Sequence, residues 1–419
     1  MSGLDRFGRP IPRMGARQVG EIVGAAGIRL SRRGNVGTRV LSARMGTFDN
    51  STPKTFRAVL SLAQHFDRLR VIFSNGNAEA TYSVAGCNVR AIADLTSAYP
   101  APVAVSLPSS GVVPVAPTSN RRGYLVSDWV DLNSVQRTDG GSYPLVVVDA
   151  YVSSAASITV LGNGSSDNFS GWANRGNGRI WRMYHNDGDC VATPANFLST
   201  TLRNQSPIVG VQYAARGRVV TVMGVGDSIT DGRGSIIGEG WGVPACEALS
   251  NMNDGVAVEW FNNGWAGATM NGWIRHALGD ACAAGLIPEI VIAPGGSPNS
   301  LGLPITTANI GDIRRGRAQL LADAAAYQVT PMLWTTLPVN TPQKNWGGSD
   351  ALRRADNDEI RALAKRGVEI IDMDAVIAGE IVGGQVQMIG GTTTDNIHPN
   401  DLGNALMSQL ARAAIGAYV

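Results

Sequence analysis

Residues 219–234 read VVTVMGVGDSITDGRG and set the type of fold that the rest of the chain follows. The stretch begins with apolar and β-branched residues, breaks at Gly224 and Gly226, and then presents Asp227 and Ser228. A buried strand that stops at glycine and then offers a hydroxyl is typical of the carboxyl edge of an α/β sheet. The stretch therefore predicts a parallel strand followed by an exposed, reactive serine.

Length and composition are those of a two-domain globular protein. The chain has 419 residues, of which 44% are hydrophobic and 16% charged, together with 51 glycines and a formal net charge of +2. Such a chain can bury a large core, and its small net charge gives no reason to expect nucleic acid or an anionic membrane as a partner. Because no run of 18 apolar residues occurs, we expect no membrane span.

The cysteines give no sign of a metal site. They are scattered along the chain, without a Cys-x-x-Cys pair and without a histidine at ligand spacing. We therefore expect no metal and no other cofactor, and interpret them as buried thiols, with a disulfide left open. They are Cys87, Cys190, Cys246 and Cys282.

Residues 1–50 are rich in arginine, glycine and small residues and show little periodicity. They are interpreted as an N-terminal arm for attachment or assembly, or as an extended lead-in to the first domain. The first 20 residues contain no apolar stretch of the kind found in secretory signals. We therefore expect the protein in the cytoplasm, or exported or particle-associated by a route that uses no such signal.

Residues 51–210 have the pattern of an antiparallel β-sandwich. Residues 68–73 alternate between polar and apolar types and stop at a Ser-Asn-Gly-Asn turn, and residues 143–152 contain a β-branched run that ends at serine. Short strands separated by turns are typical of such a sandwich. Aromatic residues near its end either pack between the domains or form a surface that contacts carbohydrate. They are Trp172, Trp181 and Tyr184.

Residues 211–419 alternate between strands and helices. Strands are predicted at 219–225, 256–261, 289–293, 331–337 and 368–373, and helices at 242–251, 272–284, 310–327, 351–366 and 400–418. This alternation predicts a parallel sheet covered by helices on both faces, in which ligands bind beyond the carboxyl ends of the strands.

A serine nucleophile needs a base, and a neutral imidazole is the usual one. Among the four histidines, His398 follows Asp395 by three residues on a loop before the last helix. That spacing lets the carboxylate reach one ring nitrogen while the other faces outward. We therefore predict that Ser228, Asp395 and His398 act together, the alternative being that the Asp395–His398 loop only caps the helix.

Acyl transfer also needs hydrogen-bond donors for the oxyanion. The backbone amides of Ser228 and Gly267 and the side chain of Asn299 are the predicted donors, because all three follow strands of the same sheet. Glycine at position 267 would let the backbone come close to a substrate. The predicted substrate contacts are Asp227, Trp265 and Trp346. For the two tryptophans, the alternative is that they pack inside the protein.

The four loops resemble the sequence blocks of the SGNH (GDSL) hydrolase superfamily, which is named for Ser, Gly, Asn and His. Gly-Asp-Ser-Ile-Thr at 226–230 matches the first block, and Asp395–His398 matches the Asp-x-x-His of the last. Residues 263–267 are similar to the second block. Residues 296–299 resemble the third, with one residue extra before Asn299 and with Ser300 where the family has Asp.

The resemblance covers residues from about 216 to 419 in the family's order and implies a flavodoxin-like three-layer α/β/α hydrolase domain. The preceding half is similar, at residues 70–75 and 127–130, to β-sandwich accessory domains of some family members. The expected domains are therefore an arm at 1–50, a jelly-roll-like β-sandwich at 51–210 and an SGNH catalytic domain at 211–419.

The implied activity is hydrolysis of carboxylic esters by a Ser-His-Asp mechanism without a metal. Tryptophan and asparagine in the loops, and the lack of an amphipathic lid segment, favour acetylated carbohydrate as the substrate. One alternative is a lipid or small-ester hydrolase of lipase, lysophospholipase or thioesterase type. Another is a particle-attached, carbohydrate-binding structural protein with vestigial activity.

Overall fold

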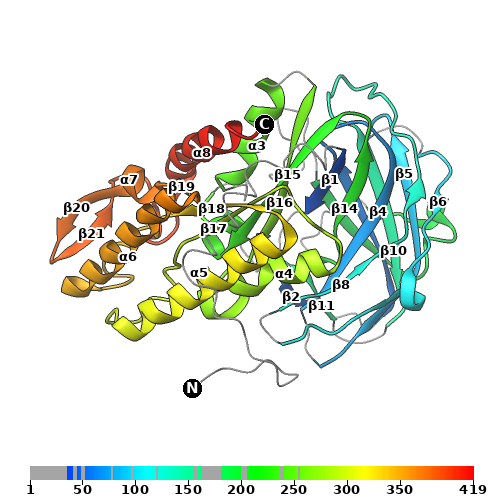
Figure 1. Ribbon diagram of the computed structural model, residues 1–419. Helices are drawn as coiled ribbons and strands as arrows, with labels where there is room; N and C mark the ends of the chain where they lie inside the picture. The colour runs from blue at the N-terminus through cyan, green and yellow to red at the C-terminus, as the bar shows by residue number, and fades with distance from the viewer. Residues whose placement is uncertain are drawn as a thin grey trace.

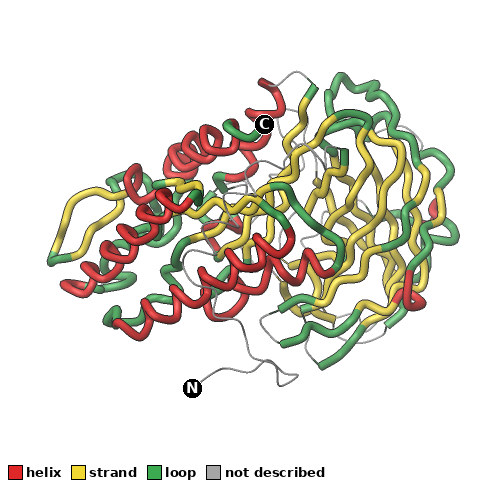
Figure 2. Tube along the Cα trace, in the orientation of Figure 1, coloured by secondary structure: helices red, strands yellow, loops and turns green. Residues whose placement is uncertain are grey.

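The computed structural model describes residues 35–40, 45–48, 52–76, 79–95, 99–118, 121–154, 158–162, 181–199, 205–235, 240–252 and 255–419. Most of the predicted N-terminal arm, and Trp172, lie outside these residues. Helices gather at one end of the molecule and antiparallel strands at the other (Figures 1 and 2).

The C-terminal half contains the predicted parallel sheet. Its strands lie in the order β19-β18-β17-β15-β16. If these five strands are numbered along the chain from β15 and the path is read from the β16 end, the order is 2-1-3-4-5, as in flavodoxin-like folds. Every residue of β17 and β18 is buried, because helices cover both faces of the sheet. The strands are β15 (Arg218–Gly226), β16 (Val256–Gly264), β17 (Ile290–Pro294), β18 (Thr330–Trp334) and β19 (Glu369–Ile371).

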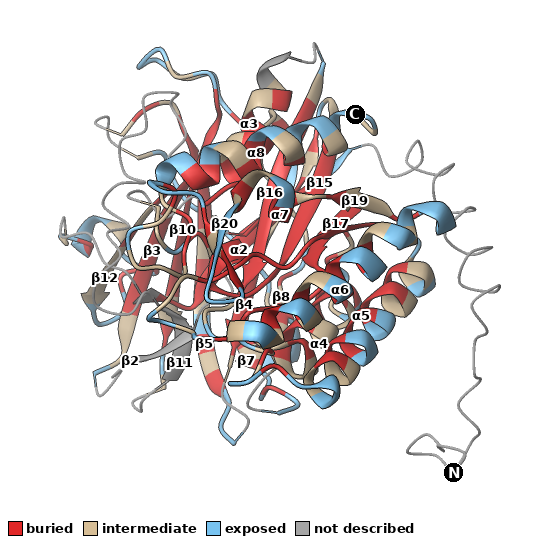
Figure 3. Ribbon diagram, turned by 90° about the vertical axis from the view of Figure 1, so that its left-hand side faces the viewer, coloured by how far each residue is buried: buried red, intermediate tan, exposed pale blue. Residues whose placement is uncertain are grey.

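Helices cover the two faces in separate groups, which confirms the three-layer α/β/α class. Helix α3 packs against α8 on one side of the sheet, while α4, α5 and α6 lie on the other (Figure 3). No helix among the described residues has the length and apolar character needed to span a bilayer. The helices are α2 (Ser228–Asp231), α3 (Gly242–Met252), α4 (Arg275–Ala283), α5 (Thr307–Tyr327), α6 (Asp350–Ala362), α7 (Met373–Ile377) and α8 (Asp401–Gly416).

The predicted elements of this half match the structure within a few residues, and the differences include the following two. The helix predicted at 272–284 begins as a π-helical turn at Met270–Ile274, where the backbone of Gly272 is not helical. A hairpin of β20 (Ala378–Val382) and β21 (Gln385–Met388) lies where the sequence pattern predicts no element. Its first strand is largely exposed, so it lacks the apolar period by which a core strand is recognised.

The N-terminal half is rich in strands, as predicted. Six of them form an antiparallel sheet with the path β12-β3-β10-β5-β6, and β7 pairs with β5. Apolar residues of this sheet share one core with residues of β4 and β14, which belong to a second sheet. The strands of the first sheet are β3 (Lys54–Ser61), β5 (Tyr82–Ile92), β6 (Val103–Ala104), β7 (Val112–Val113), β10 (Leu145–Val152) and β12 (Trp181–Asp187).

The second sheet is continuous with the parallel sheet. Strand β1 (Val36–Val40) pairs parallel with β16 and antiparallel with β14, giving the path β19-β18-β17-β15-β16-β1-β14-β4-β8. Part of the predicted arm is therefore a largely buried strand at the centre of the molecule. The predicted domain boundary near residue 210 stays a prediction, because one sheet contains strands from both sides of it. The remaining strands are β2 (Met45–Phe48), β4 (Phe66–Asn75), β8 (Gly123–Val126), β9 (Val130–Asp131), β11 (Ile158–Gly162), β13 (Gln205–Ser206) and β14 (Ile208–Ala215).

A fully buried carboxylate joins the two halves at this point. Glu259 of β16 accepts hydrogen bonds from Arg39 Nη1 at 3.1 Å, from the Tyr213 hydroxyl at 2.8 Å and from the Ala63 amide at 2.9 Å. Glu259→Ala is expected to lower the free energy of unfolding by about 3–5 kcal/mol, because it leaves the buried guanidinium of Arg39 without this carboxylate. Urea unfolding followed by tryptophan fluorescence measures the change.

The control for Glu259→Ala is a substitution that breaks an ion pair on the surface. Arg216 Nε donates to Asp67 at 2.6 Å, and the two side chains are 47% and 57% exposed. Arg216→Ala is expected to cost less than about 1 kcal/mol, because water screens an exposed pair. Equal losses in the two variants would contradict a special role for Glu259.

Candidate active site

Ser228 stands at the carboxyl end of β15, the parallel strand that lies between β16 and β17. The strand ends at Gly226, and the Asp227 side chain caps α2 by accepting the Ile229 amide at 3.0 Å. A Cβ atom on Gly226 would lie 2.0 Å from Thr230 Oγ1, so the tight turn excludes any larger residue here. The turn thus presents the Ser228 side chain at the sheet edge, although the residue is only 6% exposed.

The structure brings the three predicted catalytic side chains together. His398 Nε2 lies 2.8 Å from Ser228 Oγ, and His398 Nδ1 lies 2.5 Å from Asp395 Oδ2. Asp395 Oδ1 also accepts the backbone amides of Ile397 at 2.9 Å and His398 at 2.7 Å. The carboxylate therefore holds both the ring and the loop that carries it, while Asn400 separately caps α8.

The electrostatics of Asp395 favour an ionised carboxylate. Burial raises the pKa of this carboxyl, but hydrogen bonds from the backbone and ring of His398 and from the Ile397 amide outweigh burial, and the pKa lies below its ordinary value. Asp395 is therefore an anion at neutral pH, able to orient the imidazole and to stabilise its protonated form.

The second loop forms a tight turn beside the serine. The Trp265 amide donates to the Gly226 carbonyl at 3.0 Å, which ties this loop to the first, and the Ala268 amide donates to the Trp265 carbonyl at 2.9 Å. Gly267 is the third residue of the turn and has a φ of 83°, a conformation that favours glycine. Within the described residues, its amide donates no backbone hydrogen bond, so it can serve a ligand.

The third loop is joined to the second. Asn299 Nδ2 donates to the Ala268 carbonyl at 3.1 Å, and the Met270 amide donates to Ser300 Oγ at 2.8 Å. Asn299 thus lies beside the turn that contains Gly267. Its side-chain amide has a second N–H that this bond does not use. The hydroxyl of Ser300 thus links the third loop to the second.

Ser297 connects all three loops and was not among the predicted site residues. Its hydroxyl is fully buried and donates to Asp227 Oδ2 at 2.5 Å, and it accepts the Asn299 amide at 3.2 Å. The same oxygen lies 3.3 Å from the Ala268 carbonyl. The only feature of the sequence that could have indicated this role of Ser297 is its position after two glycines at the end of a strand. Its partners Asp227 and Ala268 lie far away along the chain.

The predicted substrate contacts differ in exposure. Trp265 is half-buried, with its ring 5.4 Å from that of Trp273 and the Arg122 guanidinium 3.9 Å from its centroid. Trp346 is only 2% exposed and belongs to the hydrophobic core, so its ring packs inside the protein instead of facing solvent. Trp181 is likewise buried. Asp227 is fully buried, and its carboxylate accepts hydrogen bonds from the Ile229 amide and the Ser297 hydroxyl.

Removing the Ser297 hydroxyl tests the link between the loops. Ser297→Ala is expected to lower the free energy of unfolding by about 1–3 kcal/mol, because the buried Asp227 loses a donor. It is also expected to lower kcat for ester hydrolysis more than it raises KM, because the loops of the predicted oxyanion donors lose their shared anchor. Ser300→Ala, which removes one half-buried hydrogen bond, is the matched control; equal kinetic losses in both variants would contradict this role.

Asp227 makes stability depend on pH. Burial raises its pKa, although hydrogen bonds from Ser297 and Ile229 and the charge of His398 oppose the shift. The folded state then binds the proton more tightly than the unfolded state, whose pKa is about 3.9. The contribution of Asp227 to stability is therefore expected to fall as pH rises from about 4 through the raised folded pKa. In urea unfolding from pH 4 to 7, the stability of Asp227→Asn should rise relative to that of the wild type, and parallel curves would contradict the assignment.

Within the described residues, no group of three or more His, Cys, Asp or Glu side chains has the arrangement of a metal site. A hydroxyl hydrogen-bonded to an imidazole, beside amides on two further loops, is an arrangement suited to acyl transfer.

Comparison with known proteins finds one family match and solved structures of low identity. Residues 225–406 match the model of the GDSL-like lipase/acylhydrolase family. A GDSL-like lipase from Bacteroides thetaiotaomicron VPI-5482 is 18% identical, over 48% of this chain and 89% of that one, with a TM-score of 0.36. The Clostridium thermocellum family 3 carbohydrate esterase is 15% identical, over 48% and 97%, with a TM-score of 0.34.

A variant of Axe2, an acetyl xylan esterase from Geobacillus stearothermophilus, is also 15% identical, over 47% of this chain and 94% of that one, with a TM-score of 0.37. No curated protein sequence matches the chain. The matched range contains Ser228, the loops that carry Gly267 and Asn299, and the Asp395–His398 loop. Residues 225–406 of this chain thus match the GDSL-like lipase/acylhydrolase family, as the sequence blocks predict.

Proposed function

We propose that the protein is a serine esterase that removes O-acetyl groups from carbohydrate. The observation that carries the mechanism is the hydrogen-bonded series from Ser228 Oγ to His398 Nε2, at 2.8 Å, and from His398 Nδ1 to Asp395 Oδ2, at 2.5 Å. These distances are short enough for proton transfer without rearrangement of the side chains.

In the proposed reaction, His398 Nε2 takes the proton as Ser228 Oγ attacks the acetyl carbon. The oxyanion accepts hydrogen bonds from the amides of Ser228 and Gly267 and from the Asn299 side chain. His398 then donates its proton to the departing sugar hydroxyl. Water, deprotonated by His398, attacks the acetyl-enzyme and releases acetate. Asp395 keeps the imidazole in the required tautomer and stays ionised throughout.

The polar approach to the serine supports a carbohydrate substrate. Asn299 is exposed, and Lys344 Nζ donates to the carbonyl of Pro298 at 2.6 Å, next to it. Burial lowers the pKa of Lys344, and the carboxylate of Asp227 opposes that shift. Amide and ammonium groups can hydrogen-bond the hydroxyls of a sugar, whereas a long acyl chain would leave them desolvated and unpaired.

The test measures acetate release from acetylated xylan, acetylated pectin and an O-acetylated bacterial glycan. The wild-type chain and Ser228→Ala are compared, with p-nitrophenyl esters of two, four and eight carbons as a chain-length series. Acetate release from at least one polymer, and a preference for the shortest acyl chain, are expected. Hydrolysis of only the longest chain would overturn the carbohydrate assignment, and equal release by Ser228→Ala would overturn the proposed nucleophile.

A further inference from the structure

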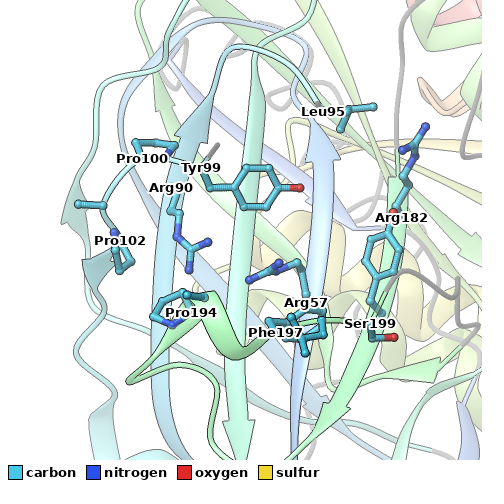
Figure 4. A pocket seen from close by; sticks show the side chains of 14 residues that line it. Arg57, Arg90, Leu95, Tyr99, Pro100, Pro102, Arg182, Pro194, Phe197 and Ser199 are labelled. Carbon is cyan, nitrogen blue, oxygen red and sulfur yellow. The ribbon is translucent and has the colours of Figure 1, made fainter. Parts of the chain in front are cut away.

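The six-stranded sheet carries a pocket of about 780 Å³ on the face away from its main core. Residues of β3, β5 and β12 form its floor, and segments at 99–102 and 194–199 form its walls (Figure 4). The volume lies within the range of about 300–1,000 Å³ that is usual for small-molecule sites. Ser228 lies at the edge of the other sheet, so this pocket is separate from the esterase site.

The floor of the pocket holds buried charges. Arg57 donates through Nε and Nη2 to the two carboxylate oxygens of Asp149, at 2.6 and 3.0 Å, and Arg90 Nη2 donates to Asp149 at 2.5 Å. The three side chains are only 10%, 2% and 1% exposed. Two guanidinium groups therefore share one carboxylate, and the floor keeps a net positive charge.

This charge is not explained by packing. Strand residues alternate between the faces of a sheet, and the neighbours of Arg57 along β3, Phe56 and Ala58, point into the core. A second buried guanidinium without its own counter-charge is costly unless an anion binds to it. Within the described residues, Nε of Arg90 has no hydrogen-bond partner. Both observations point to an anionic ligand.

Flat side chains form the walls. The Tyr99 ring centroid lies 5.3 Å from the Arg57 guanidinium, and the Phe197 ring lies 4.0 Å from it. Figure 4 shows Tyr99 on one side, and Pro194 and Phe197 on the other, with the guanidinium groups of Arg57 and Arg90 between them. Rings of this kind give flat apolar surfaces, against which the C–H face of a pyranose can pack.

We propose that this pocket binds an acidic sugar residue of the hexuronate class. Its carboxylate would lie against Arg57 and Arg90, whose planar guanidinium groups match carboxylate geometry. Its ring would pack against Tyr99 and against Tyr184 of β12, which also lines the pocket. The pocket then holds the protein on an acidic polysaccharide while the separate site acts on esters. The binding does not depend on the esterase proposal, because the carboxylate and not the acetyl group is recognised.

The experiment titrates the full-length chain with a trimer of galacturonic acid that carries no acetyl groups, by isothermal calorimetry. A xylotriose titration and a competition with inorganic phosphate are run beside it. Saturable binding of the acidic trimer is expected, weakened by salt, with no heat from xylotriose and little competition by phosphate. No binding at millimolar concentration, equal binding of the neutral trimer, or full displacement by an equal concentration of phosphate would each overturn the proposal.

Two variants assign the binding to this pocket. Arg57→Gln leaves the Arg90–Asp149 pair neutral, so the fold is expected to tolerate it, while affinity falls ~10-fold or more from the loss of a charge-assisted contact. Tyr99→Ala is expected to weaken binding by removing a wall. Leu402→Ala, at an exposed position on α8, is the control. All variants should keep wild-type hydrolysis of p-nitrophenyl acetate, and unchanged affinity in both pocket variants would overturn the site.

Discussion

Ser228→Ala is expected to lower kcat/KM for p-nitrophenyl acetate by about 10⁴–10⁶-fold. The alanine has no oxygen to attack the acyl carbon, so no acetyl-enzyme can form. The oxyanion donors and His398 remain, and a small rate above that of water should therefore persist. Initial rates at several substrate concentrations, with circular dichroism to show that the variant is folded, measure the loss.

Ser142→Ala is the matched control, because Ser142 is an exposed serine outside both sites. It should keep wild-type kinetics. An organophosphate such as diisopropyl fluorophosphate should add one adduct to the wild-type chain and none to Ser228→Ala, as seen by mass spectrometry. A variant that lacks Ser228 and still turns over at the wild-type rate would show that the hydrolysis belongs to another group or to a contaminant.

Asp395→Asn is expected to lower kcat by about 10³–10⁴-fold while leaving KM within a few-fold. An amide can still accept the backbone N–H groups of Ile397 and His398 through its oxygen, so the loop should keep its shape. Its NH₂ group would then face His398 Nδ1 and favour the tautomer with the proton on Nε2. That tautomer cannot take a proton from Ser228, and the developing imidazolium also loses its counter-charge.

The comparison for this prediction is Asp401→Asn, an exposed carboxylate in the first turn of α8 that lies outside the site. Its kinetics should match those of the wild type. Equal activity of Asp395→Asn and the wild type would mean that His398 finds its orientation from the loop alone, and that the 2.5 Å contact has no catalytic consequence.

Much of this site could be predicted from local sequence, because each of its parts is a short feature at the end of a strand. Gly226 and Ser228 follow an apolar run directly, and Asp395 and His398 are close enough to contact each other within one loop. The order of the loops along the chain then predicts a common edge, since parallel strands end at the same side of the sheet. The structure brings Ser228 and His398 to 2.8 Å across 170 residues of chain.

Contacts between loops could not be predicted in the same way. Ser297 reaches Asp227 across 70 residues, and Lys344 reaches Pro298 across 46. Neither residue stands out in its local pattern, since serine and lysine are common in loops. Trp346 shows the converse: its place in a polar insert predicts a substrate contact, but the chain folds so that its ring is buried.

The sequence by itself determined the class of the C-terminal half, the loops that carry its chemistry and the strand-rich character of the N-terminal half, because periodicity, glycine breaks and short motifs are local. Only the tertiary structure decided that β1 joins both halves in one sheet. It also decided that Arg57, Arg90 and Asp149 meet on the six-stranded sheet that packs beside it. Arg57 and Asp149 lie 92 residues apart and face each other only through the register of β3 with β10. Strand register depends on the packing of whole faces, and no local pattern records it.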